Sequence, residues 1–151
     1  MNRTPRWPVV LFDFDGTLLN TIDGIVASYT HAWRTVSGRE VTRADILPWI
    51  GRTLEDVFAD EDAANAAELE AAYMEHNVAT LAAGIKKYDG VSELVHQMVD
   101  AGIRTGVVTS KRRRTAIPAM KLAGLPEETV LACAMEDTNR HKPDPTPLLT
   151  G

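Results

Sequence analysis

The chain has 151 residues, 44% of them hydrophobic, which is enough for one domain or for one small core with an insertion. A formal net charge of −5 excludes a general electrostatic attraction to nucleic acid or to an anionic membrane. Cys133 is the single cysteine, which excludes a disulfide framework, and no run of 18 apolar residues is present, so we expect a cytoplasmic protein with a buried thiol and no membrane partner.

An apolar run of strand-forming residues that starts at Val9 predicts a first strand buried on both faces. It ends on two carboxylates, Asp13 and Asp15, which are costly inside a core and therefore belong at the tip of the strand. If the chain stays extended to Asp15, both side chains point to one side and can address one ligand. Gly16 permits a sharp turn, and Thr17 offers a hydroxyl. This pattern favours a divalent cation, a carboxylate nucleophile or both, with an ordinary Asp-Gly turn as the alternative.

The interval from residue 21 to 84 is predicted to be helical, without a strand. Apolar residues at helical spacing predict a helix over residues 22–36, and an Ala- and Glu-rich composition predicts another over residues 62–83. Between them, two Thr-x-x-Asp pairs are signals for helix starts: Thr42 with Asp45, and Thr53 with Asp56. Trp33 and Trp49 are expected in the core of this segment.

Past Gly84, helices and strands alternate. Helices are predicted at residues 91–101 and 111–123, the second starting late or kinked because of Pro118, and strands at residues 103–109 and 129–134. One strand, a long helical excursion and then alternating elements predict an α/β fold: a Rossmann-like parallel sheet with crossover helices and a helical cap inserted after the first strand.

Three polar groups should meet at the carboxyl edge of this sheet, where ligands gather in such folds. They are Asp13 with Asp15, Thr109 with Ser110, and Lys142 on the loop after the third strand. Two acids for a metal, a hydroxyl with backbone N–H groups, and a cation are the parts that stabilise a transferring phosphoryl group.

In these segments the chain resembles the haloacid dehalogenase (HAD) superfamily of phosphohydrolases. Residues 13–17, 107–111 and 142–145 are similar to its first three motifs, and residues 47–51 are similar to the phosphoglycolate phosphatase and pyrophosphatase branch. The resemblance implies a HAD-like core made of residues 1–19 and 86–151, with a helical cap at residues 20–85.

The resemblance also implies catalytic roles. Asp13 is the expected nucleophile, which forms an aspartyl-phosphate, and Asp15 is the expected general acid and then base. Mg²⁺ is the implied cofactor, bound by the Asp13 carboxylate and the Asp15 backbone carbonyl. Lys142 is expected to neutralise charge and to orient Asp13.

Five further residues are expected to bind substrate. Carried across by motif, the Thr109 hydroxyl and the Ser110 N–H hold phosphoryl oxygens, and Gly16 and Thr17 lie in the same loop as the two acids. Arg52, next to a glycine in the cap, is a candidate for substrate contact because a guanidinium suits carboxylate or phosphate recognition.

The resemblance implies Mg²⁺-dependent hydrolysis of a small phosphate ester or of pyrophosphate, and the acid at Asp15 favours phosphoryl transfer over carbon–halogen cleavage. The family's fourth motif, an acidic cluster, has no counterpart after Lys142. We therefore expect a core that lacks its C-terminal strands, roughly 60 residues, and a first strand whose open edge can pair with another polypeptide. Two alternatives remain: a catalytically incomplete chain that binds metal, phosphate or a partner, and a sugar-phosphate mutase.

The basic run at residues 111–114 is a further feature of the sequence. In an acidic protein it indicates a solvated helix start more than a nucleic-acid contact, so no nucleic acid partner is expected. Lys111 has a second interpretation, in which it adds positive potential near the phosphate pocket. The four histidines have no spacing that suggests a site.

Overall fold

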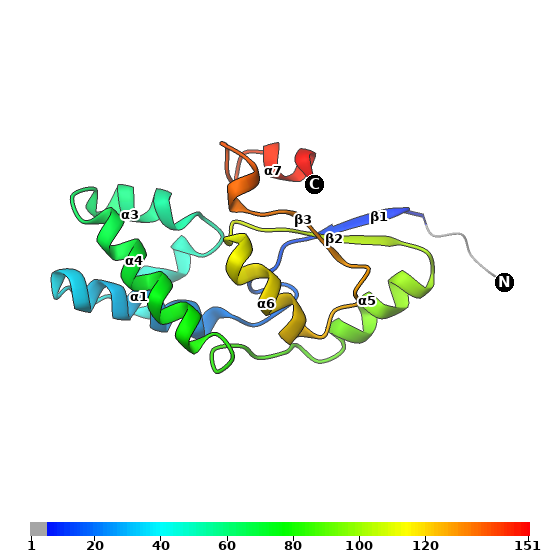
Figure 1. Ribbon diagram of the computed structural model, residues 1–151, viewed down its shortest axis with the longest axis horizontal. Coiled ribbons are helices and arrows are strands. Elements are labelled where there is room, and N and C mark those ends of the chain that lie inside the picture. Colours follow the sequence, from blue (N-terminus) through cyan, green and yellow to red (C-terminus); the bar gives the residue numbers. More distant parts are fainter. Residues whose placement is uncertain (1–5) are drawn as a thin grey trace. The chain divides into compact units, whose positions relative to one another are not determined.

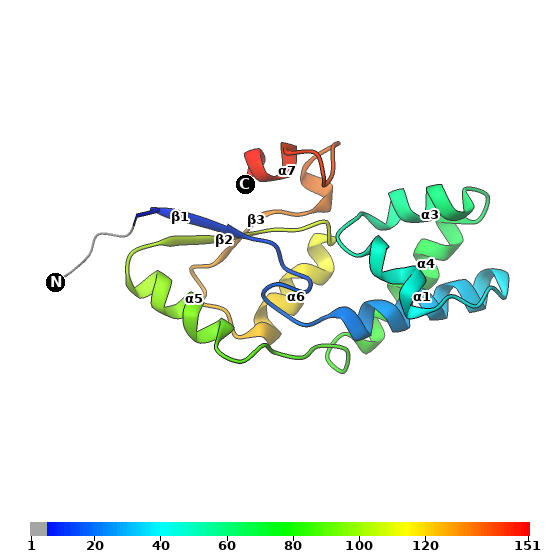
Figure 2. The same cartoon turned by 180° about the vertical axis from the view of Figure 1, so that it is seen from behind.

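The computed structural model describes residues 6–151, and the backbone divides into two compact units. The first unit comprises the chain up to Asn20 and from Lys86 onward, and the second comprises Thr21–Ile85. Figures 1 and 2 show both units from opposite sides.

The first unit is built on a parallel three-stranded sheet. Its strands are β1 (Val9–Phe12), β2 (Arg104–Val108) and β3 (Val130–Cys133), in the order β1-β2-β3. All neighbouring strands are parallel, and Phe12 pairs with Val107 near the carboxyl ends of the first two. The predicted α/β class and all three predicted strands are confirmed.

The position of each strand in the sheet decides its burial. Four of the five residues of β2, the central strand, are buried, whereas none of β1 is, and Val9 is 41% exposed. Among the described residues, β1 pairs with β2 alone and its other edge is open. The prediction that the first strand is buried on both faces is therefore wrong, because an edge strand lacks a neighbour on one side.

Helices lie on both sides of this sheet. Figures 1 and 2 show α5 (Val91–Asp100) and α6 (Arg113–Ala123) on one side and α7 (Thr146–Thr150) on the other. Pro118 lies inside α6, which starts at Arg113, two residues after the predicted start at residue 111. The alternation of strands with crossover helices is the topology that parallel pairing requires.

The second unit is helical throughout the described residues. Its elements are α1 (Ile22–Ser37), α2 (Arg43–Ile46), the 3₁₀ turn η1 (Leu47–Trp49), α3 (Leu54–Asp62) and α4 (Ala66–Thr80). The single helix predicted over residues 62–83 is shorter, because a turn at residues 63–65 separates α3 from α4. The helices α1 and α4 pack against each other.

Aromatic side chains form the core of the second unit. The ring of Tyr29 lies 5.2 Å from Trp49, 5.4 Å from Phe58 and 4.8 Å from Tyr73, between ring centroids. Trp33 joins the same cluster and, like Trp49, is buried, as the sequence predicts. Tilted and edge-on aromatic pairs of this kind add to the stabilisation from buried area.

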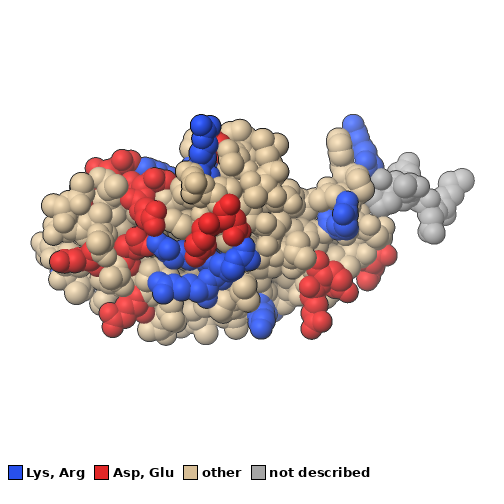
Figure 3. Space-filling model, turned by 45° about the horizontal axis from the view of Figure 1, so that its top comes forward, with Lys and Arg blue, Asp and Glu red and all other residues tan. Residues whose placement is uncertain are grey.

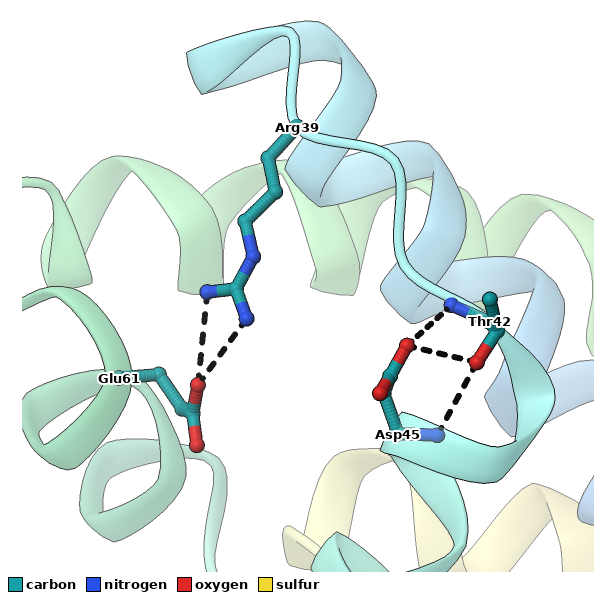
Figure 4. A network of polar contacts seen from close by, with 4 residues as sticks. All are labelled: Arg39, Thr42, Asp45 and Glu61. Carbon is teal, nitrogen blue, oxygen red and sulfur yellow. Dashed lines mark hydrogen bonds and ion pairs between the residues drawn. The ribbon is translucent and has the colours of Figure 1, made fainter.

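Short-range polar contacts set where the helices of the second unit begin. The Thr42 hydroxyl accepts from the Asp45 N–H at 3.3 Å, and the Asp45 carboxylate accepts from the Thr42 N–H at 2.8 Å, which is a capping box (Figure 4). The Thr53 hydroxyl accepts from the Asp56 N–H in the same way. Both predicted helix starts are confirmed.

The surface carries both signs of charge. Acidic and basic side chains lie next to one another on the face shown in Figure 3, where most of the area belongs to other residues. In the second unit, Arg39 and Glu61 form an ion pair across 3.3 Å (Figure 4). Within residues 6–151, no helix combines the length and the apolar character that crossing a bilayer requires.

Candidate active site

Parallel pairing brings two predicted site segments to one edge of the sheet. Asp13 follows β1 and Thr109 follows β2, and the register that pairs Phe12 with Val107 brings both strand ends to the same level. The Thr109 N–H donates to the Cys133 carbonyl at the end of β3, 2.9 Å away. The carboxyl ends of all three strands are thereby joined by backbone contacts.

A tight turn follows the first strand. The carbonyl of the fully buried Phe14 accepts from the N–H groups of Thr17, Leu18 and Leu19 at 3.1, 3.0 and 3.3 Å. Gly16 donates back to Leu19 at 2.8 Å and has a φ of 79°, a left-handed conformation that favours glycine. These bonds fix the backbone of residues 14–19, which follows Asp13 and contains Asp15.

Asp13 is held on both carboxylate oxygens. Lys142 Nζ donates to its Oδ1 at 2.5 Å and to the Val108 carbonyl at 2.9 Å, and the Thr17 hydroxyl donates to its Oδ2 at 3.3 Å. The side chain of Asp13 remains 42% exposed and that of Lys142 31%. A carboxylate that is oriented by a cation yet open to solvent has the geometry required of a nucleophile.

Asp15 has a lysine of its own. Lys111 Nζ donates to Asp15 Oδ1 at 3.2 Å, and the two side chains are only 8% and 15% exposed, respectively. For Lys111, the interpretation of the basic run as a solvated helix start is wrong. Sequence reasoning missed this pair, for which the one signal is a lysine two positions after Thr109.

The loop after β2 presents the hydroxyl expected to bind phosphate. Thr109 is buried, and its hydroxyl oxygen accepts from the Lys111 N–H at 3.1 Å, which leaves the hydroxyl proton able to donate to another group. Ser110 lies between them and is half-buried. A threonine hydroxyl beside backbone N–H groups is a suitable partner for an anionic oxygen.

The loop that carries Lys142 is shaped by Asp144. Its carboxylate accepts from the backbone N–H of Thr146 at 2.9 Å and from the hydroxyl of the same residue at 2.5 Å. These two bonds, the hydroxyl first, lower the pKa of Asp144. The carboxylate therefore stays ionised and holds the loop that delivers Lys142 to Asp13.

A second member of the basic run also has a structural partner. The Arg113 guanidinium pairs with Asp137, and its backbone N–H donates to the Glu136 carboxylate at 3.0 Å. Asp137 in turn accepts from the Ala134 N–H at 2.8 Å. These contacts fasten the start of α6 to the segment after β3, whereas Arg114 is exposed.

Arg52 belongs to the second unit. Its guanidinium pairs with Asp60 of α3 across 2.5 Å and is 37% exposed. Its expected contact with substrate remains a prediction.

The donor set fits a magnesium ion. Within residues 6–151, no three side chains of His, Cys, Asp or Glu gather as a metal cage. Mg²⁺ commonly takes one or two protein carboxylates and completes its shell with water and substrate phosphate, so Asp13 and Asp15 are sufficient partners. Cys133 is fully buried, as predicted, and burial raises the pKa of its thiol, so a thiolate ligand is disfavoured.

Comparison with known proteins gives consistent matches. A family model described as haloacid dehalogenase-like hydrolase matches residues 10–151. Pyrophosphatase PpaX of Halalkalibacterium halodurans is 37% identical over 139 residues, a match that covers 92% of this chain and 65% of that protein. The chain thus spans a little under two thirds of the length of this relative.

Solved structures agree in fold. A protein from Lactobacillus plantarum assigned as a phosphoglycolate phosphatase has a TM-score of 0.81 and 26% identity, covering 95% of this chain and 69% of that one. Protein Tyrosine Kinase A (PtkA) of Mycobacterium tuberculosis has a TM-score of 0.75 and 31% identity, covering 88% and 62%. The chain belongs to the haloacid dehalogenase-like hydrolase family, on the side of its phosphoglycolate phosphatases and pyrophosphatases.

Proposed function

We propose that the protein that contains this chain is a cytoplasmic, Mg²⁺-dependent phosphohydrolase that acts on a small phosphate ester or on pyrophosphate through an aspartyl-phosphate. The observation that carries the proposal is the Asp13 carboxylate, held by Lys142 and Thr17 at the end of β1. The names of the relatives support this class of substrate.

In the first step, an oxygen of Asp13 attacks phosphorus, and the bond from phosphorus to the leaving oxygen breaks. The carboxyl group of Asp15 gives its proton to that leaving oxygen. Lys142 orients Asp13 and offsets the charge of the incoming phosphoryl group, and Thr109 and Ser110 bind its oxygens. Mg²⁺, held by the Asp13 carboxylate and the Asp15 backbone carbonyl, would supply further neutralisation of charge when bound.

In the second step, a water molecule attacks phosphorus, and the bond between Asp13 and phosphorus breaks. The Asp15 carboxylate accepts the proton of that water, phosphate leaves, and both acids return to their starting states. The two carboxylates thus have separate roles, which suits the separate lysines that hold them.

We also propose that residues 20–85 act as a cap that selects substrate, with Arg52 as a contact for the anionic part of the leaving group. The independent aromatic core of the second unit supports its movement as one body. An arginine suits the carboxylate of phosphoglycolate and the second phosphate of pyrophosphate equally well.

The test is hydrolysis of 4-nitrophenyl phosphate, with and without Mg²⁺, by the whole polypeptide that the reading frame of this chain encodes. Asp13→Asn should abolish hydrolysis because the nucleophile is lost, whereas Asp100→Asn, at an exposed acid of α5, should leave it unchanged. An inactive wild-type protein, or activity that survives Asp13→Asn, would contradict the proposal.

A second candidate is transfer of the phosphoryl group to an acceptor other than water. It is favoured by the 31% identity to a structure whose name is that of a tyrosine kinase. A sugar-phosphate mutase is one member of this class. The residues at the carboxyl edge suit a sugar hydroxyl as the acceptor of the phosphoryl group as well as they suit a water molecule. Product analysis with a hexose phosphate distinguishes the two: free phosphate indicates hydrolysis, and an isomeric hexose phosphate indicates a mutase.

A third candidate is a non-catalytic module that binds metal or phosphate, or that pairs with a partner through β1. Its support is the open edge of that strand, where Val9 is 41% exposed, together with the preceding Trp7, which is 63% exposed. Light scattering of the isolated 151-residue chain tests the pairing: self-association, or binding of a polypeptide that carries further strands of this fold, is expected. A chain that stays monomeric and does not bind such a polypeptide would contradict the proposed pairing.

A further inference from the structure

The two acids at the end of β1 are held by two lysines in different environments. Lys142, paired with Asp13, is 31% exposed, whereas Lys111, paired with Asp15, is 8% exposed. Burying a lysine costs free energy unless the ammonium group is paired, and here the carboxylate of Asp15 is a partner. The ammonium group of Lys111 is thus held by the Asp15 carboxylate and has little contact with solvent.

The backbone of Lys111 is itself fixed. Its N–H donates to the Thr109 hydroxyl at 3.1 Å, and its carbonyl accepts from the Met135 N–H at 3.1 Å. The residue therefore lies in a short connection between β2 and α6 that is held on both sides. A side chain on such a support aims its ammonium group with little conformational freedom.

We infer that Lys111 is a positioning residue for Asp15 and that it holds this carboxyl group for proton transfer to the leaving oxygen. The inference rests on the proposed function, in which Asp15 is the acid. When Asp15 gives up its proton, it becomes a carboxylate, and the ammonium group at 3.2 Å stabilises the new negative charge while it forms. Lys111 needs no contact with the phosphoryl group for this role.

The role predicts a dependence on the leaving group. An alkyl phosphate releases a strongly basic oxygen that needs a proton, whereas 4-nitrophenyl phosphate releases a phenolate that needs none. In the whole protein, Lys111→Met should therefore lower kcat/KM, which reports the steps up to departure of the leaving oxygen, by about 100-fold for an alkyl phosphate and by less than about 5-fold for 4-nitrophenyl phosphate.

The chain offers a matched control in the same basic run. Arg114→Met removes the same charge from an exposed side chain three residues away. It should leave the rate of hydrolysis of both substrates unchanged. In an Asp15→Asn background, Lys111→Met should have no further effect on the alkyl phosphate, because the group it positions is no longer an acid. Lys111→Arg, which restores a cation, should recover part of the loss.

An equal loss on both substrates, no loss on either, or an undiminished effect in the Asp15→Asn background would overturn the inference. Lys111→Gln serves as a second variant if Lys111→Met does not fold, and failure of both to fold would also contradict the inference, since it would make Lys111 a structural residue. A wild-type protein inactive on both substrates would instead remove the proposed function itself.

Discussion

The two units of the chain bury different kinds of side chain and use polar contacts over different distances along the sequence. In the second unit, an aromatic cluster fills the core, and its helix caps join residues three positions apart, such as Thr42 and Asp45. In the first unit, the ion pairs of the candidate site are long-range: Lys142 and Asp13 are 129 positions apart, and Lys111 and Asp15 are 96 apart.

The two units also differ in how many large apolar side chains they expose. In the first unit, large apolar side chains are exposed at or next to both edge strands and on α5, α6 and α7: Trp7, Val9, Leu94, Ile117, Leu122, Val130, Leu148 and Leu149. The second unit has fewer on its surface, Leu47 and Val78. The comparison indicates that the second unit derives its stability from a closed core, whereas the sheet of the first unit brings the residues of the candidate site together.

Removing an aromatic ring from the second unit should have the largest effect on stability. Phe58 is fully buried in the aromatic cluster, so Phe58→Ala should lower the free energy of unfolding of this unit by about 3–5 kcal/mol. Hydrogen exchange resolved by residue would show lost protection within residues 21–85. Leu47→Ala, at a side chain that is 48% exposed, is the control and should cost less than about 0.5 kcal/mol. Equal losses would show that the core is not closed.

Removing the cation from Asp13 should affect activity more than stability. Lys142→Met should lower kcat by about 10²–10³-fold, because the oriented cation offsets charge in the transition state. The free energy of unfolding should change by about 1 kcal/mol or less, since the pair is partly exposed. Lys121→Met, at an exposed lysine of α6, should change neither quantity appreciably. A large loss of stability with Lys142→Met would show that this ion pair stabilises the fold, contrary to the comparison of the two units.

Removing a helix cap from the second unit should have a moderate effect. Thr42→Ala should lower the free energy of unfolding by about 1 kcal/mol, because the Asp45 N–H loses its acceptor and the carboxylate loses the hydroxyl that also lowers its pKa. Urea titration measures the change. Thr42→Ser keeps the hydroxyl and should be nearly neutral; a matching loss for both variants would show that the methyl group, not the cap, matters.

The smallest expected effect is a dependence of stability on pH. Burial, followed by the neighbouring His31, lowers the pKa of His76 below its usual 6.5. As pH falls through 6.5, the unfolded chain therefore binds a proton that the folded state takes up less readily, and the free energy of unfolding declines. His76→Gln should flatten this decline between about pH 7 and about pH 5.5, and His31→Gln should reduce it. An unchanged pH profile in His76→Gln would contradict the assignment.

Local patterns in the sequence were sufficient for most of the secondary structure. The helix starts at Thr42 and Thr53, the three strands and the burial of Trp33 and Trp49 were all predicted, because each depends on residues close together in the chain. The long helix expected over residues 62–83 was the exception, since composition indicates helix propensity but not the turn that interrupts it.

Contacts between distant residues were not predictable in the same way. His31 and His76 lie on α1 and α4, and their rings stack at 4.6 Å although nothing in their spacing indicates it. The burial of Lys111 against Asp15 and the pairing of Arg113 with Asp137 likewise arise only when separate segments come together. A run of four basic residues is consistent with a solvated surface until the partners of each one are known.

The amino-acid order thus specified which residue types stand at the ends of the predicted strands, and hence the class of chemistry, because strand termini and turn residues are encoded over a few positions. Folding decided which lysine serves which acid and which edge of the sheet stays open, because both depend on strand order and on packing between elements that lie far apart in the chain.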